Sequence, residues 1–321
     1  MHSLLTNIWN AFMITYYKNN ATGIAIAANH ADAIWTSAVN PTEAEKRYLI
    51  DELRLPDAFY NDIEDIDERP RIEFENGWCL IIVRMPFKND DNKLPYTTAP
   101  LGIIFNEETC ISLCFVENEL IDDFVVYSQR KNITVNDNFS LVFRLLLSSS
   151  IWFQKYLKQI NQGIKLAESN LERSVRNEDL QALFRMEKCL EYFITSLKGN
   201  ELLFYRIKNL KTHKETFDPE MVEDVEIEIK QAQDTTNIYS NILTGMMDAY
   251  ASVISNNLNV VMKRLTSISI ILMIPTLVAS LYGMNVPNSL QDNPYGFAIV
   301  LCGSLLLSIV GVILFRKKNL F

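Results

Sequence analysis

Residues 248–285 read DAYASVISNNLNVVMKRLTSISIILMIPTLVASLYGMN, and this stretch decides how the chain is built. From Leu265 it carries no charged residue, and the uncharged run continues to Gln291. A second uncharged run, residues 295–315, has the length of roughly 20 residues that a helix needs to cross a bilayer. The sequence therefore predicts two membrane-spanning helices, residues 265–282 and 295–315, at the C-terminal end.

The charges are distributed unevenly along the chain. Of 30 Lys and Arg and 39 Asp and Glu, only Asp292, Arg316, Lys317 and Lys318 lie beyond Leu265. The remaining part is therefore strongly acidic, which disfavours nucleic acid as a partner and favours a cation. Surplus acid also keeps proteins soluble, so this simpler explanation stays open at this point.

The cysteines point to a reducing compartment. There are five, an odd and scattered number, and the N-terminal segment lacks the pattern of a secretory signal. Cys110 and Cys114 lie in the apolar alternation TCISLCFV, where both would occupy one face of a strand. We expect them to be buried as small hydrophobic residues rather than to bind a metal.

Basic residues set the expected orientation in the membrane. Residues 282–294, between the two apolar runs, contain no Lys or Arg, whereas Lys263 and Arg264 precede the first run and the tail 316–321 is basic. By the positive-inside rule, both termini are cytoplasmic and the loop 283–294 is external. We expect a multi-pass protein of the cell (inner) membrane.

The cytoplasmic part divides into two segments. Residues 1–138 predict an α/β domain, with β-rich runs at 23–28, 78–85, 99–105 and 109–116. Helices are expected from Pro41, placed at a first helical position, and over residues 55–67.

Long helices are expected after residue 138. Residues 139–264 predict a stalk region, with two helices that break near residues 176–179. Asp218 would cap a third helix that starts at Pro219 and continues to Tyr282, about 95 Å at 1.5 Å per residue. Residues 265–321 form the predicted transmembrane domain.

A line of polar and small residues runs along this third helix. Steps of four and three residues from Asp248 define the polar line, which contains no Leu, Ile, Val or Phe: Asp248, Ser252, Ser255, Asn259, Met262, Thr266, Ser269, Met273, Thr276, Ser280 and Gly283. A dry coiled coil needs branched apolar residues at such positions. Parallel copies of this helix would instead line a narrow wet channel.

Helix packing is the alternative explanation of the polar line. Small residues commonly bring transmembrane helices together. The line stays polar where the helix enters the cytoplasm, however, and it ends at Asp248, whose copies would form a carboxylate ring at the inner end of a cation path. At the outer end, Gly283, Met284 and Asn285 would place amide and carbonyl oxygens, which suit a hydrated Mg²⁺.

These features resemble the CorA magnesium channels. The motif YGMN, residues 282–285, ends the first of two C-terminal spans, and a short external loop, a basic tail and an α/β domain followed by long helices accompany it. The resemblance implies an α+β membrane protein that assembles as a homopentamer with a funnel of stalk helices. It implies pore-facing positions that coincide with the polar line, together with Asn285 and with Leu265 beside Met262 at a hydrophobic gate.

The resemblance also implies function and regulation. The pore would carry Mg²⁺, and also Co²⁺ and Ni²⁺, into the cytoplasm, and intracellular Mg²⁺ would close it by binding between subunits. Asp224, with Glu223 adjacent, matches the stalk acid. Its partner from the next subunit lies in LPDAFYNDIEDIDERPRIEF, which offers four candidates: Asp57, Asp62, Asp65 and Asp67. Alternatively, acids in the first turn of the stalk helix complement its dipole.

The sequence also bears on functions other than Mg²⁺ transport. A zinc transporter of the same superfamily is an alternative, although Met284 favours Mg²⁺; the external loop departs from the family pattern because Asp292 is its only acid. A membrane-anchored sensor or scaffold would not need a polar line. No phosphate loop, paired zinc ligands or His-centred constellation indicates an enzyme, and no organic cofactor is expected.

Overall fold

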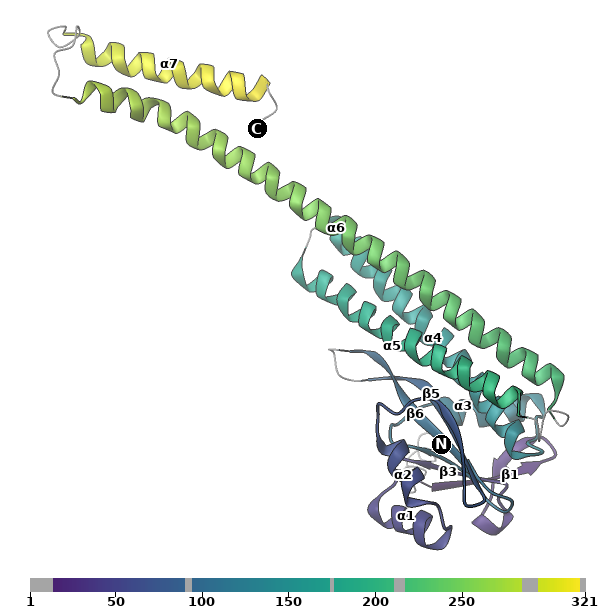
Figure 1. Ribbon diagram of the computed structural model, residues 1–321. Helices are drawn as coiled ribbons and strands as arrows, with labels where there is room; N and C mark the ends of the chain where they lie inside the picture. Colours follow the sequence, from purple (N-terminus) through teal and green to yellow (C-terminus); the bar gives the residue numbers. More distant parts are fainter. Residues whose placement is uncertain (1–13, 90–93, 174–175, 211–216, 285–293, 318–321) are drawn as a thin grey trace, which may run out of the picture. The chain divides into compact units, whose positions relative to one another are not determined.

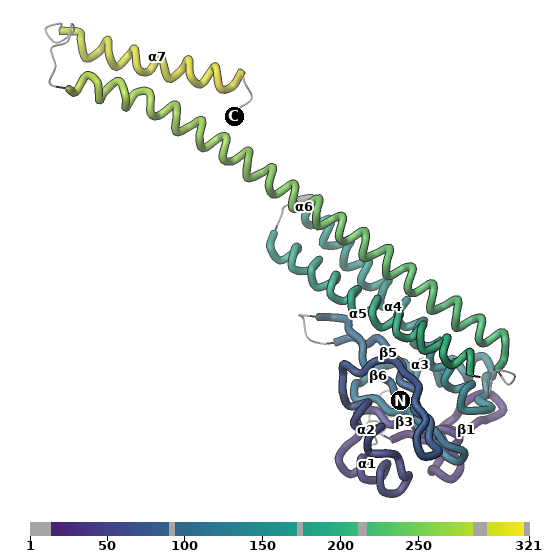
Figure 2. Tube along the Cα trace, in the orientation of Figure 1, coloured from purple at the N-terminus to yellow at the C-terminus, as the bar shows by residue number. Residues whose placement is uncertain are grey.

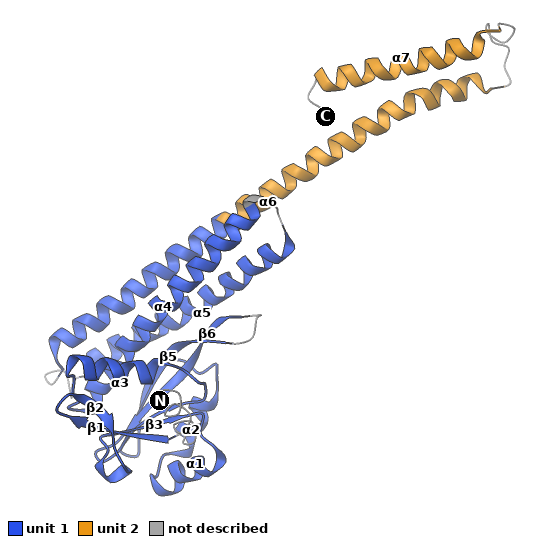
Figure 3. Cartoon of the chain, turned by 180° about the vertical axis from the view of Figure 1, so that it is seen from behind, with its two compact units in different colours: residues 1–245 blue, residues 246–321 orange. Residues whose placement is uncertain are grey.

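The computed structural model describes residues 14–89, 94–173, 176–210, 217–284 and 294–317. The chain forms two compact units, Met1–Gly245 and Met246–Phe321 (Figure 3). Unit 1 contains the sheet and three long helices, and unit 2 contains a helical hairpin. One helix, α6, belongs to both units and continues without a break from one to the other (Figure 2).

Unit 1 is built on a seven-stranded sheet of order β2-β1-β3-β7-β6-β5-β4. The strands are β1 Ile14–Asn20, β2 Gly23–Ile26, β3 Trp35–Val39, β4 Arg71–Glu75, β5 Trp78–Lys88, β6 Tyr96–Phe105 and β7 Cys110–Cys114. Only β3 and β7 pair in parallel among these strands. The longest antiparallel ladder joins β5 and β6, from Cys79↔Phe105 to Lys88↔Tyr96.

The four predicted β-rich runs correspond to β2, β5, β6 and β7, but the sequence prediction missed β1, β3 and β4. β1 and β4 carry many polar residues and are largely exposed or half-buried. β3 buries the polar residues Thr36 and Ser37. Such strands form because a neighbouring strand supplies their hydrogen-bond partners, and local composition does not reveal that neighbour. Cys110 and Cys114 are buried in β7, as predicted.

Short helices cover the sheet. They are η2 His30–Asp32, α1 Glu43–Arg47, the π-helical turn η3 Tyr48–Glu52, α2 Asp57–Glu64 and α3 Leu120–Lys131, which was not predicted. The prediction that Pro41 opens a helix was wrong by two residues. Thr42 is the N-cap, and it forms a capping box with Glu45, so the helix starts at Glu43.

The two faces of the sheet bury different helices. Phe59, Tyr60 and Ile63 of α2 pack with Leu80 and Ile104 on one face. A Cβ atom on Gly102 would lie 2.6 Å from Cγ1 of Ile63, so α2 approaches β6 as closely as a glycine allows. The opposite face packs against α4 Asn138–Arg173 and α5 Asn177–Lys208 (Figure 1).

The predicted long helices are confirmed. The break between α4 and α5 precedes Asn177, and α6 covers Pro219–Tyr282, which are the predicted limits of the third helix. The carboxylate of Asp218 accepts a hydrogen bond from the amide of Glu220 at 3.1 Å, as expected of a capping residue. In unit 1, α6 lies beside α4 and α5 (Figures 1 and 3).

Unit 2 contains the end of α6 and α7 Gly296–Lys317. In the described part of the chain, these two helices are long and apolar enough to cross a membrane. They lie against each other, because a Cβ atom on Gly311 of α7 would lie 3.5 Å from Ile274 and 3.9 Å from Ile271 of α6.

Candidate ion pathway and regulatory acids

In a single chain, the polar line on α6 is exposed along its whole length. Every member from Asp248 to Gly283 has an exposed side chain or, for Gly283, an exposed backbone. The apolar members are no exception, since Met262 is 51% and Met273 is 66% exposed. Leu265, beside the line, is 57% exposed. No other part of this chain therefore covers the predicted pore face within the described residues.

The helix α7 covers a different face of α6. From residue 251 to the end of α6, the residues that are not exposed are Ser267, Ile271, Ile274, Pro275 and Val278. At 3.6 residues per turn, this face lies about half a turn from the polar line. Contact with α7 thus leaves the polar line free.

Small residues do hold α6 and α7 together, but on that other face. Ser267 of α6 is 3% exposed and Ser304 of α7 is 5% exposed. Gly311 lies close to Ile271 and Ile274, as the packing of small residues between transmembrane helices requires. Packing within the chain therefore does not account for the polar line.

Hydroxyl groups on the line donate to their own helix. Ser252 donates to the carbonyl of Asp248 at 3.0 Å, Ser269 to that of Leu265 at 2.9 Å, and Thr276 to that of Leu272 at 3.0 Å. Each hydroxyl proton is thereby used, while the oxygen keeps its lone pairs. These side chains consequently present acceptors, which suits the water shell of a cation.

The exposed line extends further than the sequence prediction. Stepping back from Asp248 by three and four residues gives Gly245, Asn241, Ile238, Asp234, Gln231, Ile227, Asp224 and Glu220, all exposed. The buried residues of α6 in unit 1, such as Val225, Ile229 and Thr236, lie about half a turn away. The sequence prediction did not extend the polar line to Glu220 and Asp234, although the same spacing reaches both residues.

The C-terminal end of α6 closes tightly. The amide of Gly283 donates to the carbonyl of Ala279 at 2.8 Å, and a Cβ atom there would lie 3.2 Å from the same oxygen. Met284 is 57% exposed. Asn285 and the loop to residue 293, which includes Asp292, lie outside the described residues, as does Lys318 in the tail.

The four N-terminal acids have different surroundings. Asp57 accepts a hydrogen bond from Asn61 at 3.3 Å, and Asp62 forms an ion pair with Arg71 at 2.6 Å. Asp65 accepts a hydrogen bond from the amide of Asp67 at 3.0 Å. Asp67 is exposed and forms no ion pair within the described part of the chain. Only Asp62 is thus neutralised by a direct cationic partner.

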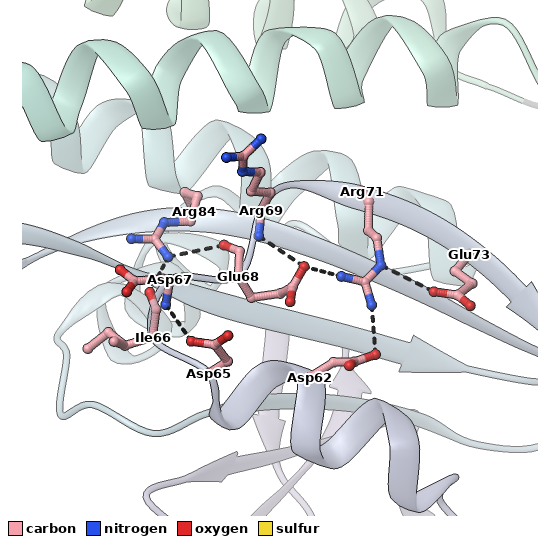
Figure 4. A network of polar contacts seen from close by, with 9 residues as sticks. All are labelled: Asp62, Asp65, Ile66, Asp67, Glu68, Arg69, Arg71, Glu73 and Arg84. Carbon is pink, nitrogen blue, oxygen red and sulfur yellow. Dashed lines mark hydrogen bonds and ion pairs between the residues drawn. The ribbon is translucent and has the colours of Figure 1, made fainter.

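Arg71 is the centre of an acidic group (Figure 4). Its guanidinium contacts Asp62, Glu68 and, at 3.2 Å, Glu73. These acids come from α2, from the segment before β4 and from β4 itself. One cation therefore holds three carboxylates that would otherwise repel one another.

Arg84 fixes the segment that carries Asp65 and Asp67. It is 7% exposed, and its guanidinium donates to the carbonyls of Ile66 and Glu68 (Figure 4). It also donates to both oxygens of Thr98. Burial lowers the pKa of this arginine, while the nearby acids Asp67 and Asp65 oppose that shift.

The backbone of Arg84 is bound in turn by the long helices. Asn200 of α5 accepts from its amide at 2.8 Å and donates to its carbonyl at 2.7 Å, and Ser149 of α4 donates to the same carbonyl. Sequence reasoning missed Arg71 and Arg84. Arg84 could have been noticed in the sequence, because it is a single charged residue within an apolar β-rich run.

The stalk acids lie in a separate place. Glu223 and Asp224 are exposed in the first turns of α6, whereas Glu226 pairs with Lys208 of α5 at 2.5 Å. The hydrogen bond from Lys208 is the main cause that lowers the pKa of Glu226. Among the described residues, no group of three His, Cys, Asp or Glu side chains could hold a metal ion. A single chain therefore does not bring the predicted regulatory acids together.

Comparison with known proteins decides the family. The family model of the CorA-like Mg²⁺ transporter protein matches residues 30–317, which include the sheet, the long helices and both apolar helices. The chain belongs to the CorA family. It is a membrane protein and a divalent cation transporter rather than an enzyme, and this finding sets aside the sensor or scaffold alternative.

Individual CorA relatives cover most of the chain. The cobalt/magnesium transport protein CorA of Methanocaldococcus jannaschii is 25% identical over 293 residues, 89% of this chain and 90% of that protein. The protein of the same description from Thermotoga maritima is 28% identical over 269 residues, 80% of this chain and 74% of that one.

Solved structures agree with the fold. The complete CorA magnesium transporter from M. jannaschii matches with a TM-score of 0.80 at 21% identity, covering 97% of this chain and 99% of that one. The cytoplasmic domain of ZntB from Vibrio parahaemolyticus matches with a TM-score of 0.58 at 14% identity, covering 77% of this chain and 98% of that one. The predicted α/β domain, long helices and two apolar helices are confirmed as the CorA fold.

Proposed function

We propose that this CorA-family protein conducts Mg²⁺, and also Co²⁺ and Ni²⁺, into the cytoplasm through a pore formed by five copies of the chain. The pore is lined by the polar line of α6, and intracellular Mg²⁺ closes it. Relatives described as cobalt/magnesium transport proteins support the choice of ions.

The observation that carries the proposal is the exposed face of α6. In both stretches where α6 has packing partners, those partners contact the opposite side of the helix. Within the exposed surface of α6, the polar line presents hydroxyl groups where a membrane helix would ordinarily present apolar residues to lipid. Parallel copies that turn this face to a common axis remove it from lipid and supply the water-filled path.

The chemistry of the line suits a hydrated divalent ion. Ser269 and Thr276 offer acceptor oxygens, and the carboxylates of Asp248 and Asp234 would form rings in the cytoplasmic part of the path. At the outer mouth, a ring of Asn285 amides selects the ion through its water shell, since Mg²⁺ loses water reluctantly. Met262 and Leu265 narrow the path at the hydrophobic gate.

Closure by intracellular Mg²⁺ follows from repulsion between acidic copies. A cation bound between Asp224, with Glu223, and an acid of residues 57–67 in a neighbouring copy draws its ligands from two chains. Such an ion stabilises the closed assembly only by binding it more tightly than the open one.

Membrane topology completes the proposal. The α/β domain 1–138 and the stalk 139–264 lie in the cytoplasm with both termini. The transmembrane domain 265–321 lies in the cell membrane with its loop 283–294 outside. The absence of Lys and Arg from the loop, against the basic residues that flank the spans, supports this orientation.

Flux into reconstituted vesicles tests the proposed function. We expect the purified chain to admit Mg²⁺ in preference to Zn²⁺, with or without a proton gradient. Asn285→Ala should lose affinity and selectivity, because it removes the converging amides. Unchanged affinity and selectivity in this variant would refute the assigned filter, and a strict requirement for a proton gradient would refute a passive channel.

A pair of Asp224 variants tests the regulation separately. Asp224→Ala should conduct at internal Mg²⁺ concentrations that silence the parent, whereas Asp224→Lys should stay closer to closed, because an ammonium can pair with the neighbouring acid. Equal inhibition of the parent and both variants would place the regulatory site elsewhere without affecting the proposed pore.

A further inference from the structure

The edge of β5 at Arg84 is completed by a helix instead of a strand. β4 pairs with β5 only as far as Arg71↔Ile82, and Pro100, the residue opposite Arg84 on β6, has no amide hydrogen to donate. The side-chain amide of Asn200 on α5 accepts a hydrogen bond from the amide of Arg84 at 2.8 Å and donates one to its carbonyl at 2.7 Å. Asn200 is fully buried, so breaking these bonds would leave buried polar groups unpaired. α5 is therefore joined to the sheet by the two hydrogen bonds that a strand would make.

The side chain of Arg84 holds the segment that carries two of the candidate regulatory acids. Its guanidinium donates to the carbonyls of Ile66 and Glu68, the residues on either side of Asp67 (Figure 4). Asp65 accepts a hydrogen bond from the amide of Asp67 at 3.0 Å. Arg84 thus binds the acid-bearing segment through its side chain and α5 through its backbone.

Two further contacts bring α5 against this region. A Cβ atom on Gly199 would lie 2.8 Å from Cγ of Pro70, so α5 approaches the segment as closely as a glycine allows. Oγ of Ser196 lies 2.8 Å from Oγ1 of Thr98, which also accepts a hydrogen bond from the guanidinium of Arg84 at 2.9 Å. Both contacts lie on the side of α5 that carries the buried asparagine. The segment and this side of α5 therefore form one closely packed body.

α5 is hydrogen-bonded in turn to the stalk helix α6. Nε2 of Gln233 donates to the carbonyl of Leu197 at 3.2 Å and to the carboxylate of Glu201 at 3.0 Å. Gln233 directly precedes Asp234 of the exposed line of α6. Within unit 1, hydrogen bonds therefore connect the acid-bearing segment with α5, and α5 with the helix that carries the proposed pore face.

We propose that Arg84 and Asn200 are positioning residues that pass the effect of bound intracellular Mg²⁺ from the segment 65–68 to α5 and α6. This inference rests on the proposed closure of the pore by that ion. An ion that binds an acid of the segment and Asp224 of a neighbouring copy pulls on the segment. Arg84 and α5 follow, because buried hydrogen bonds would otherwise be left unpaired. Binding at the segment and closure of the pore then share one coupling free energy.

Currents through the full-length chain in inside-out membrane patches test the role of Asn200. The quantity measured is the residual fraction, which is the current with saturating Mg²⁺ on the cytoplasmic face divided by the current with EDTA there. We expect Asn200→Ala to raise this fraction at least about fivefold over the parent, which is the lower end of the usual coupling between two sites. A variant that is merely less stable loses current under both conditions and keeps the residual fraction of the parent.

Leu183→Ala is the matched control for lost stability. It truncates another fully buried residue of α5, about 25 Å along the helix from Asn200. Its residual fraction should equal that of the parent. If Asn200→Ala does not yield folded protein, Ser196→Ala, which removes only the contact with Thr98, should raise the residual fraction in the same direction, and a fraction equal to that of the parent would overturn the proposal.

Hydrogen exchange separates transmission from a role in building the metal site. Mg²⁺ should slow exchange of the backbone amides of residues 65–69 equally in the parent and in Asn200→Ala, because the acids are unchanged. Loss of this protection in the variant would show that Asn200 only supports the site, and would overturn the proposal.

The parent separates this inference from the regulation on which it rests. If Mg²⁺ suppresses the parent current and suppresses Asn200→Ala to the same residual fraction, the role of Asn200 is overturned while the proposed regulation stands. A parent current that cytoplasmic Mg²⁺ does not suppress would overturn the regulation itself, and this inference with it.

Discussion

Replacing Arg71 with glutamine removes the one cation that holds three carboxylates in unit 1. Arg71 contacts Asp62, Glu68 and Glu73, and Asp62 is one of the acids proposed to bind intracellular Mg²⁺. If Asp62 binds Mg²⁺ as proposed, arginine and the metal ion compete for the same carboxylate. We expect Arg71→Gln to strengthen the regulatory binding of Mg²⁺.

The magnitude follows from the exposure of these groups. The side chain of Arg71 is 27% exposed, and those of Asp62, Glu68 and Glu73 are 37%, 22% and 43% exposed. Partly exposed ion pairs of this kind contribute about 0.2–1 kcal/mol each. A gain of about 1 kcal/mol corresponds to about fivefold in affinity. The Mg²⁺ concentration at half-effect should thus fall by about 1.4- to fivefold.

Limited proteolysis measures this shift. Full-length protein is digested with chymotrypsin, which does not cut at the altered residue, over a titration with Mg²⁺, and the midpoint of protection is compared between variants. Arg130→Gln, an exposed arginine at the end of α3, changes the charge equally and should leave the midpoint unchanged. An unchanged or higher midpoint in Arg71→Gln would show that Asp62 is not a regulatory ligand.

Three further predictions concern the pore face, the packing of α2 and the cysteines. Thr276→Leu should abolish Mg²⁺ flux into vesicles by filling the path, whereas Leu277→Ile should be tolerated, and equal flux in both would restore helix packing as the role of the polar line. Gly102→Ala should destabilise unit 1 by about 1–3 kcal/mol through its clash with Ile63, and Ile63→Ala in the same chain should relieve part of that cost. Thermal melting followed by tryptophan fluorescence checks this compensation, which additive effects would contradict. Burial raises the pKa of three thiols to about 12, so iodoacetamide at pH 8 should leave them unmodified until the protein unfolds, as peptide mass spectrometry can show: Cys79, Cys110 and Cys114.

Much of the candidate ion path could be predicted from the sequence alone. The limits of α6 follow from the cap at Asp218 and from the absence of a strong breaker before Tyr282. The polar line follows from a period of three and four residues within one helix, and all its members proved exposed. These features are local, because they depend on residues a few positions apart on one element. The role of Asn285 stays a prediction.

Other features depend on partners that sequence spacing does not reveal. The strands β1, β3 and β4 were missed because their neighbours, not their composition, make them strands. The face of α6 that contacts α7 could not be chosen beforehand, since small residues occur on both sides of the helix.

The regulatory acids show most clearly that sequence spacing does not reveal tertiary partners. Their spacing left four candidates open, and only the fold placed Arg71 against Asp62 and turned the guanidinium of Arg84 toward Ile66 and Glu68. Arg84 meets Asn200 across 116 positions of sequence. The sequence by itself determined the helices and their polar face, because periodicity acts within one element. Tertiary structure alone decided which charges meet, because ion pairs and buried hydrogen bonds join segments that only folding brings together.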